Sequence, residues 1–339
     1  MIVITTILFS STTVRGQETS PPPDAAPDVS DRVEPAPKNK QTPAEQVDTP
    51  IVGISFENPV NSKWKVGVRV TGGSSPALNV FVSIPVPNDW PEQRVTMADE
   101  ALPPTVGDVK FRDLESGVRQ LIITIPRLNA NEEVELTTTF LVATSQINAP
   151  PDPTIFVRPK TAHRAGKLYL GESPDIHFHD SKIRKQVKEL TTDKANIWQE
   201  IESIYDWVRD NIEQRDSKPA DSVAVFRDQV GSEEDKVGLF IALCRAHKIP
   251  ARMVWVEGSF HAEFMLVDRN VDPHWFPCNV VGIREFGSIA EPRVIVQKGD
   301  NIRVPEKEVR QKFVREFMSC QGQSKPGVEF IRELLPADD

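Results

Sequence analysis

Residues 231–252 read GSEEDKVGLFIALCRAHKIPAR, and this stretch decides the fold of the second half of the chain. Its apolar side chains recur at spacings of three and four residues, which is typical of a helix with one face toward a core. Four residues make up that face: Val237, Phe240, Ile241 and Cys244. The pattern predicts a helix from about Glu234 to His247, which ends at Lys248-Ile249-Pro250 because proline cannot continue a helix.

The neighbouring sequence predicts another helix before this stretch and several strands after it. Asp193 is placed to cap the earlier helix, whose apolar residues also recur at helical spacing: Ile197, Ile201, Ile204, Val208 and Ile212. The predicted strands are Arg252–Val256, His261–Val267, a segment around Trp275–Asn279, and Arg293–Val296, with a turn at Gly299-Asp300. Residues 309–335 are amphipathic, and their pattern selects neither helix nor strand.

Residues 51–148 alternate between apolar and polar side chains, as half-buried strands do. Four runs place their members on one strand face each: Trp64, Val66, Val68 and Val70; Leu78, Val80, Val82 and Ile84; Leu121, Ile123 and Ile125; Val134, Leu136, Thr138, Phe140 and Val142. Turn signals such as Gly72-Gly73-Ser74 separate the runs. The pattern predicts an antiparallel β-sandwich, and its lack of clustered catalytic residue types favours a binding or spacer domain.

The first 50 residues carry no sign of a packed core. An apolar run at Ile2–Phe9, followed by small residues, resembles a signal peptide ending near Gln17, which predicts an exported protein. Residues 21–50 are rich in proline and poor in large apolar side chains, which indicates an extended linker. The chain is therefore expected to be α+β, with five parts: a signal peptide at 1–17, a disordered linker at 18–50, a β-sandwich at 51–148, a connector at 149–180, and an α+β domain with a C-terminal extension at 181–339.

Composition excludes several classes of function. The formal net charge of -9 argues against nucleic acid as a partner. No apolar run reaches the roughly 20 residues that a membrane-spanning helix needs. The three cysteines, Cys244, Cys278 and Cys320, are too few for a disulfide framework and fit no zinc-binding spacing. We expect neither a metal nor a cofactor.

The segment from Ile197 to Asn279 resembles the transglutaminase-like superfamily, because many elements agree in order and spacing. The matching segments are Tyr205-Asp206-Trp207-Val208, Gly231-Ser232-Glu233-Glu234-Asp235, the run from Leu239 to Arg252, His261-Ala262, and Trp275-Phe276-Pro277-Cys278-Asn279. The resemblance implies a papain-like cysteine acyl-transfer fold. It places the family's catalytic triad at Glu233, His261 and Asn279, with Gly231, Asp235 and Trp275 in support.

Two positions of this triad depart from the family. Glu233 stands where the family carries its nucleophilic cysteine, and a carboxylate is a weak nucleophile for amide acyl transfer. Asn279 replaces the usual aspartate, a milder change because an amide oxygen can still orient an imidazole. Cys244 is predicted on the core face of its helix, and strand alternation points Cys278 away from Asn279. None of the three cysteines is expected to replace the missing nucleophile.

Glu233 has other roles open to it. At a helix N-terminus its carboxylate is stabilised by the helix dipole, and an ion pair with His261 is possible. A metal held by Glu233, His261 and Glu263 is the weaker alternative, and His177 and His179 are expected to be surface side chains. We therefore expect a non-catalytic module that binds a protein or peptide or supports the sandwich. The alternative is an active hydrolase or acyltransferase that uses Glu233 and His261 for acid–base chemistry.

Overall fold

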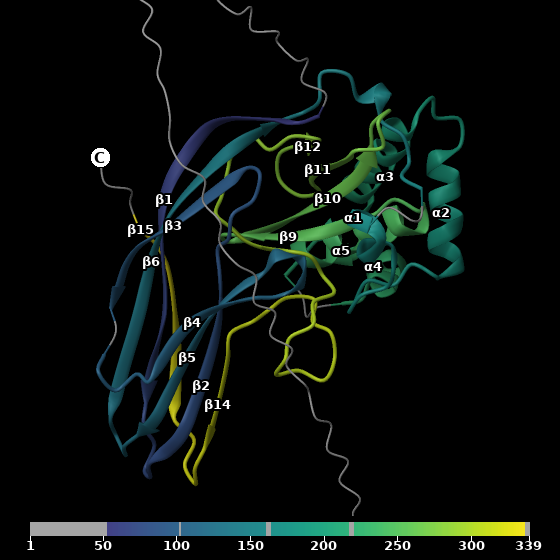
Figure 1. Ribbon diagram of the computed structural model, residues 1–339. Helices are drawn as coiled ribbons and strands as arrows, with labels where there is room; N and C mark the ends of the chain where they lie inside the picture. The colour runs from purple at the N-terminus through teal and green to yellow at the C-terminus, as the bar shows by residue number, and fades with distance from the viewer. Residues whose placement is uncertain (1–52, 102, 161–163, 217–219, 336–339) are drawn as a thin grey trace, which may run out of the picture. The chain divides into compact units, whose positions relative to one another are not determined.

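Long strands whose alternating side chains are buried build the first core of the protein. Figure 1 shows these strands in the computed structural model. The structure describes residues 53–335 except residues 102, 161–163 and 217–219, so the predicted signal peptide and linker lie outside the described residues. Two four-stranded antiparallel sheets face this core. Their orders are β15(Gly327–Leu335)-β1(Ser55–Thr71)-β6(Glu133–Asn148)-β3(Gln93–Ala101) and β14(Phe317–Gln321)-β2(Ala77–Val86)-β5(Arg119–Leu128)-β4(Asp108–Asp113).

Three of the four predicted strand faces point entirely into this core, and β2 differs at one residue. Val80, Val82 and Ile84 are buried as expected, but Leu78 is 43% exposed and Ala77 is buried in its place. Asn79 adopts a positive φ of 50°, and the register of β2 with β14 shifts by one residue between Phe81 and Leu78. This bulge inserts one residue into the alternation and turns Leu78 to the opposite face of the strand.

The C-terminal residues complete the sandwich, which the predicted boundaries of 51–148 and 181–339 did not anticipate. β15 pairs with β1 from Lys63↔Leu335 to Thr71↔Gly327, and β14 pairs with β2. Each strand extends a different sheet at its edge, so the two strands cover main-chain groups of β1 and β2 that would otherwise be unpaired. Residues 309–335 alternate weakly because edge strands bury only part of one face.

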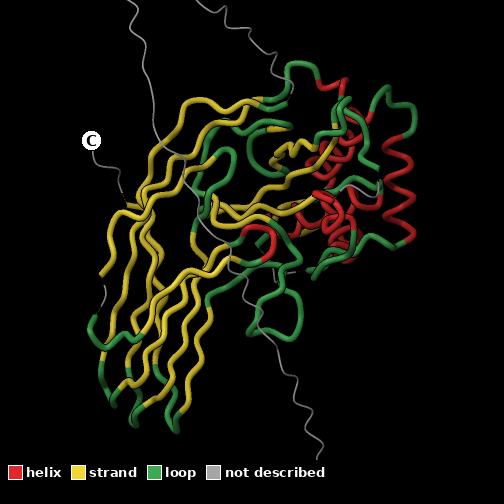
Figure 2. The backbone as a smooth tube through the Cα atoms, in the orientation of Figure 1, coloured by secondary structure: helices red, strands yellow, loops and turns green. Residues whose placement is uncertain are grey.

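A five-stranded antiparallel sheet with helices on one side forms the second half of the fold (Figure 2). Its order is β12(Glu285–Phe286)-β11(Pro273–Asn279)-β10(Ser259–Val267)-β9(Ala251–Val256)-β13(Ile295–Lys298). The helices are α1(Arg164–Lys167), α2(Ser181–Thr191), α3(Ile197–Asn211), α4(Ser222–Asp228) and α5(Glu233–Ala246). Short 3₁₀ turns lie at 115–117, 153–155 and 168–170, and a two-residue parallel pair joins β7(Glu213–Gln214) to β8(Val230–Gly231).

Helix α5 is the centre of this second core. Its predicted apolar face is buried, and so are its other side chains from Val237 to Arg245, because α2, α3 and α4 cover the sides that do not meet β9 and β10. The predicted cap of α3 is wrong. Asn196 caps this helix by accepting from the Gln199 N–H, whereas Asp193 adopts a left-handed turn with a φ of 63°.

The sandwich and the second sheet share a continuous contact within the compact unit of residues 49–339. The buried side chain of Gln93 donates to the Ile295 carbonyl at 2.9 Å and accepts from the Ile295 N–H at 2.7 Å, as a paired strand residue would. Ile147 and Ile289 form an isolated antiparallel bridge nearby. None of the helices described between residues 53 and 335 has the length and apolarity to cross a membrane.

Candidate functional site

The start of α5 is fixed by a capping box. The Ser232 hydroxyl accepts from the Asp235 N–H at 3.2 Å, and the Asp235 carboxylate accepts from the Ser232 N–H at 3.0 Å. The other carboxylate oxygen of Asp235 accepts from the Ala220 N–H at 3.1 Å. Gly231 is needed because an added Cβ would lie 2.9 Å from the Asp235 Cβ. Gly231 and Asp235 therefore support the first turn of α5.

Glu233 is the first residue of α5, as predicted, and its carboxylate binds the start of β10. One oxygen accepts from the Phe260 N–H at 3.0 Å and from the Ser259 hydroxyl. The N-terminal end of the helix dipole also favours a negative charge here. The side chain thus links the tip of the helix to the strand that carries His261.

His261 and Asn279 lie side by side on neighbouring strands. Ala262 of β10 pairs with Cys278 of β11, and this register places His261 opposite Asn279 on the same sheet face. Both residues line a cavity of about 250 Å³ between the sandwich and the second sheet. The structure therefore brings two of the three predicted triad positions onto one cavity. Glu233 does not line it.

The orienting hydrogen bond of a working triad is not made. The Oδ1 atom of Asn279 accepts from the Val281 N–H at 3.2 Å, and the Nε2 atom of His261 has no hydrogen-bond partner among the described residues. Burial lowers the pKa of His261 to about 4, and the positive charges of Lys298, Arg252 and Arg293 act in the same direction. The imidazole is therefore neutral near pH 7, and no described residue forms a hydrogen bond with its Nε2 atom.

The ion pair considered as one possibility for Glu233 and His261 is not formed in the described part of the chain, where the Glu233 carboxylate instead accepts from Ser259 and Phe260. Two causes account for this: His261 is neutral, and the Glu233 carboxylate is occupied by Ser259 and Phe260. Glu263 is also unsuited to the alternative metal site. Its oxygens are bound by Arg252 at 2.6 Å and by Lys298.

Glu263 belongs to a buried chain of charges that runs from the sheet to the sandwich. Arg252 pairs with Glu263, Glu263 with Lys298, and Lys298 with Glu92 at 2.5 Å. Two cations alternate with two carboxylates, so each buried charge has an opposite neighbour. Coulombic attraction to Arg252 and Lys298 outweighs burial and lowers the pKa of Glu263 to about 2. This chain fixes one wall of the cavity.

Trp275 supports the same wall through Arg252. The Arg252 guanidinium carbon lies 4.1 Å from the centre of the Trp275 ring and 5.7 Å from that of Tyr169. Cation–π contacts of this kind hold a buried arginine without a further anion. The supporting role predicted for Trp275 is therefore the orientation of Arg252.

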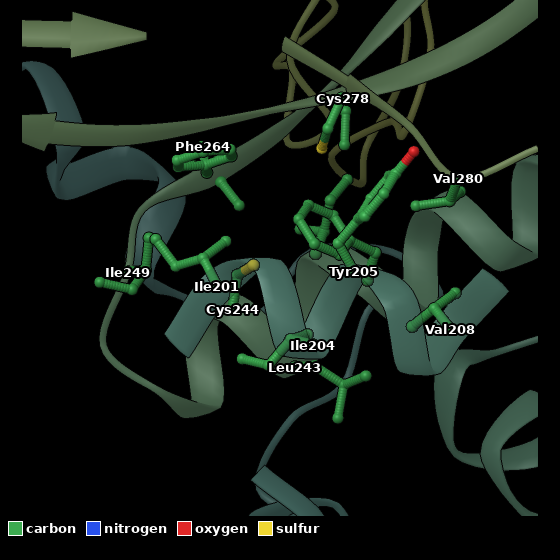
Figure 3. Close-up of a cluster of buried hydrophobic side chains, with 14 of the residues drawn as sticks. Ile201, Ile204, Tyr205, Val208, Leu243, Cys244, Ile249, Phe264, Cys278 and Val280 are labelled. Carbon is green, nitrogen blue, oxygen red and sulfur yellow. The ribbon is translucent and has the colours of Figure 1, made fainter. Parts of the chain in front are cut away.

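Cys244 and Cys278 lie in the apolar core with no exposed surface, as Figure 3 shows. Burial raises the pKa of both thiols, that of Cys278 well above its ordinary value. Cys320 lies on β14 of the sandwich, packed against the other core. Neither Cys244 nor Cys278 therefore occupies a site where a thiolate would be stabilised.

Several residues around the cavity could not be identified from the sequence. Glu92 lies in the sandwich, more than 150 positions from His261, and no local pattern links the two. Arg293 was assigned to a predicted strand, but it lies just before β13 and lines the cavity. Ser259 lies two residues before His261 on the same face of β10, but the predicted strand began at His261 and left it out.

Comparisons with known proteins agree with this arrangement. Residues 184–279 match the family model of the Transglutaminase-like superfamily. The structure is similar to that of a "putative cysteine protease" from Cytophaga hutchinsonii, with a TM-score of 0.56 and 17% identity, over 84% of this chain and 94% of that chain. A "putative protease" from Parabacteroides distasonis matches over 65% of this chain and 47% of that chain, with 14% identity and a TM-score of 0.28. No curated protein matches the sequence.

The family match ends at Asn279 and includes Glu233 and His261, so it covers all three triad positions. The similarity to the Cytophaga hutchinsonii structure extends over most of this chain and concerns the fold alone. Residues 184–279 are therefore a transglutaminase-like core, carried by a chain with the α+β fold of that structure.

Proposed function

We propose that this protein is a non-catalytic transglutaminase-like protein that binds a peptide or a protein segment in the cavity beside His261. One observation carries the proposal: the residue at the nucleophile position is a glutamate, and its carboxylate holds the start of β10. A carboxylate used in this way gives no stable acyl intermediate. The absent orienting bond of His261 points in the same direction.

The cavity itself favours binding. Pockets that take ligands combine apolar walls with a few polar groups that fix orientation. This cavity has aliphatic residues such as Ile147, Ile289 and Ile295 beside the polar side chains of His261 and Asn279. Since it lies where the sandwich meets the sheet, both halves of the protein contribute to recognition.

Incorporation of a fluorescent primary amine into a glutamine-containing protein tests the proposal. We expect no incorporation with the full chain, with or without a thiol alkylator, because the buried thiols have raised pKa values. An active transglutaminase serves as the positive control. Turnover that the alkylator abolishes would show that one of the native cysteines acts as a nucleophile, and the proposal would fail.

The alternative of an acid–base hydrolase using Glu233 and His261 makes a different prediction. Such an enzyme would turn over ester or amide substrates in the presence of the alkylator and would lose this activity in Glu233→Gln. The separate surroundings of the two side chains disfavour it, because Glu233 does not line the cavity that contains His261.

We further propose that the protein is exported, on the strength of the apolar run at Ile2–Phe9. The proline-rich residues 21–50 would then hold the folded part away from the surface to which the chain is delivered. Mass spectrometry of the protein from its native cells tests this. Loss of a segment ending near Gln17 is expected, and an intact N-terminus would contradict it.

A further inference from the structure

Helix α2 carries an excess of positive charge on its exposed side. Its buried side, with Ile183 and Val187, packs against α3 and α5, and its other side faces solvent at the outer edge of the helices (Figure 1). The exposed side holds all the basic residues of the helix, here called the basic face: Lys182, Arg184, Lys185 and Lys188. This helix is therefore basic in a chain whose formal net charge is -9.

The acidic residues of α2 do not balance the basic face. Glu189 is the one carboxylate within the helix, and it forms an exposed pair with Lys185 at 3.7 Å. The Asp180 carboxylate is used as the helix cap and accepts from main-chain N–H groups of the first turn. Apart from Lys185, no member of the basic face forms a side-chain hydrogen bond or ion pair with a residue that the structure describes.

These cations lie where they lower the stability of the helix. Residues three or four apart are neighbours on a helix surface, and like charges at that spacing repel each other. The basic face contains such pairs along its whole length: Lys182 with Lys185, Lys185 with Lys188, and Arg184 with Lys188. Lys182 also lies in the first turn, where the helix dipole disfavours a positive charge.

Solvation does not explain this arrangement. Water satisfies the hydrogen bonds of each exposed cation, but the repulsion between neighbouring cations remains, and no described carboxylate offsets it beyond Glu189. Positions at which a sequence breaks a local rule of stability without a compensating contact are expected to be functional. The basic face is therefore expected to meet an anionic partner.

The composition of the basic face favours an extended anionic surface over a protein groove. None of the large apolar side chains exposed among the described residues lies on α2, whereas protein interfaces are built around apolar and aromatic anchors and are poor in lysine. Three of its members are lysines, whose compact charge on a flexible stem adapts to phosphates without a fixed arrangement. Clusters of about four to eight basic residues on one helix are typical of binding to anionic phospholipids.

We propose that the basic face of α2 binds the surface of a lipid bilayer that contains anionic phospholipids. Its side chains lie among the lipid phosphates in this contact, and each strengthens binding about fivefold. The acidic remainder of the chain is repelled by the same surface, so the protein is oriented with α2 toward the bilayer. The inference is independent of the proposed function of the cavity beside His261.

Sedimentation of the full chain with lipid vesicles tests the proposal. One set of vesicles is phosphatidylcholine alone, and the other contains about one third of the anionic lipid phosphatidylglycerol. At about 0.1 M salt, where exposed charges more than about 10 Å apart are screened, we expect phosphatidylglycerol to increase binding at least tenfold. At about 1 M salt the screening length falls to about 3 Å, and this increase should disappear.

Two double variants with the same loss of charge assign the binding to α2. Lys182→Gln combined with Lys188→Gln should weaken binding to the anionic vesicles at least tenfold. Its urea midpoint should stay unchanged or rise, because pairs of like charges are removed. Lys110→Gln combined with Lys325→Gln is the matched control, since both lysines are exposed on the sandwich, and it should bind as the wild type does.

Three results would overturn the inference. Binding that does not increase with phosphatidylglycerol would exclude the bilayer, and binding to immobilised polyglutamate in its place would assign the basic face to an acidic protein. Equal weakening by the two double variants would reduce the effect to net charge. A lower urea midpoint of the α2 variant would show that its lysines stabilise the fold.

Discussion

Glu233 shows how one side chain changes the chemistry of a site without changing the backbone around it. The capping box of Ser232 and Asp235 holds the helix start independently of Glu233. The two donors that bind its carboxylate, Ser259 and the Phe260 N–H, would equally stabilise another anion. A cysteine placed here should therefore find conditions that favour a thiolate.

We accordingly expect Glu233→Cys to introduce a reactive thiol. Its pKa should be lowered by the helix dipole and the two donors, and it should react with iodoacetamide at pH 7 about tenfold faster than a free thiol. Mass spectrometry after timed alkylation would measure this, with Cys320 as the internal comparison and the buried Cys244 as the slow limit. We expect little transamidation, because His261 lacks an orienting partner. Ordinary reactivity of the new thiol would mean that the helix start no longer stabilises an anion.

His261 predicts a dependence of stability on pH. Its pKa is about 4 in the folded protein and 6.5 as a free side chain, so between these values the unfolded chain binds a proton that the folded chain does not. Stability is therefore lost as the pH falls from 6.5 toward 4, by about 3 kcal/mol from this side chain. Urea unfolding at pH 7 and at pH 4 should show a smaller loss for His261→Gln than for the wild type.

A control separates this effect from general acid unfolding. His177 is a half-exposed histidine outside the cavity, with its side chain 45% exposed. His177→Gln removes a histidine outside the cavity and is the comparison variant, and Glu263, whose pKa is about 2, loses its contribution only at lower pH, from 4.5 downward. Identical pH dependence of His261→Gln and the wild type would contradict the buried, neutral imidazole.

At the scale of helices and strands, the sequence predicted best those elements whose apolar residues repeat regularly within one short segment. Helix α5 was predicted within one residue at each end, and β9, β10 and β11 were predicted within two. Burial of Thr138 on the apolar face of β6 also followed from alternation alone. Each of these helices and strands has one side against a core along its whole length. Its apolar residues therefore repeat with the period of a helix or a strand, and the sequence shows that repeat.

The misassigned elements are those whose structure depends on a single backbone angle or on distant partners. Asn79 has no apolar signal that would reveal its bulge, and Leu78 therefore appeared to continue the buried face of β2. The strand predicted at 293–296 is found at Ile295–Lys298, where Gln93 from the sandwich fixes its start. Neither feature follows from periodicity in one segment.

For the candidate site, the sequence likewise predicted the positions of the residues but not their interaction partners. Glu233, His261 and Asn279 lie within the segment that matches the family model, and the helix and strands that carry them were predicted within two residues at each end. The partners that decide their chemistry were not, since Glu92 reaches the site from the sandwich and Lys298 from β13, at the far edge of the second sheet. The loss of the His261 orienting bond depends on where the Asn279 amide points, which a residue type cannot show.

At the scale of the whole molecule, the chain leaves the sandwich after β6, forms the second sheet with its helices, and returns to the sandwich with β14 and β15. The two halves are therefore connected by the chain at two points. β14 and β15 follow the transglutaminase-like core in sequence but pair with β2 and β1. Arg332 of β15 also pairs with Glu316 and lies 5.2 Å from the centre of the Trp255 ring on β9. The sandwich therefore needs residues from beyond the core to close both sheets.

Ending the chain at Glu316 should expose this dependence. Removal of β14 and β15 leaves the edges of β1 and β2 unpaired along the registers Lys63–Thr71 and Leu78–Ser83, and unpaired edges promote association between chains. We expect a shift to larger species in size-exclusion chromatography and a lower urea midpoint, with a synthetic peptide of residues 317–335 restoring the monomer. Leu334→Lys in the full chain is the control, because Leu334 is 50% exposed and the strand remains. A shortened chain that stays monomeric with an unchanged midpoint would show that the two sheets are stable without their C-terminal strands.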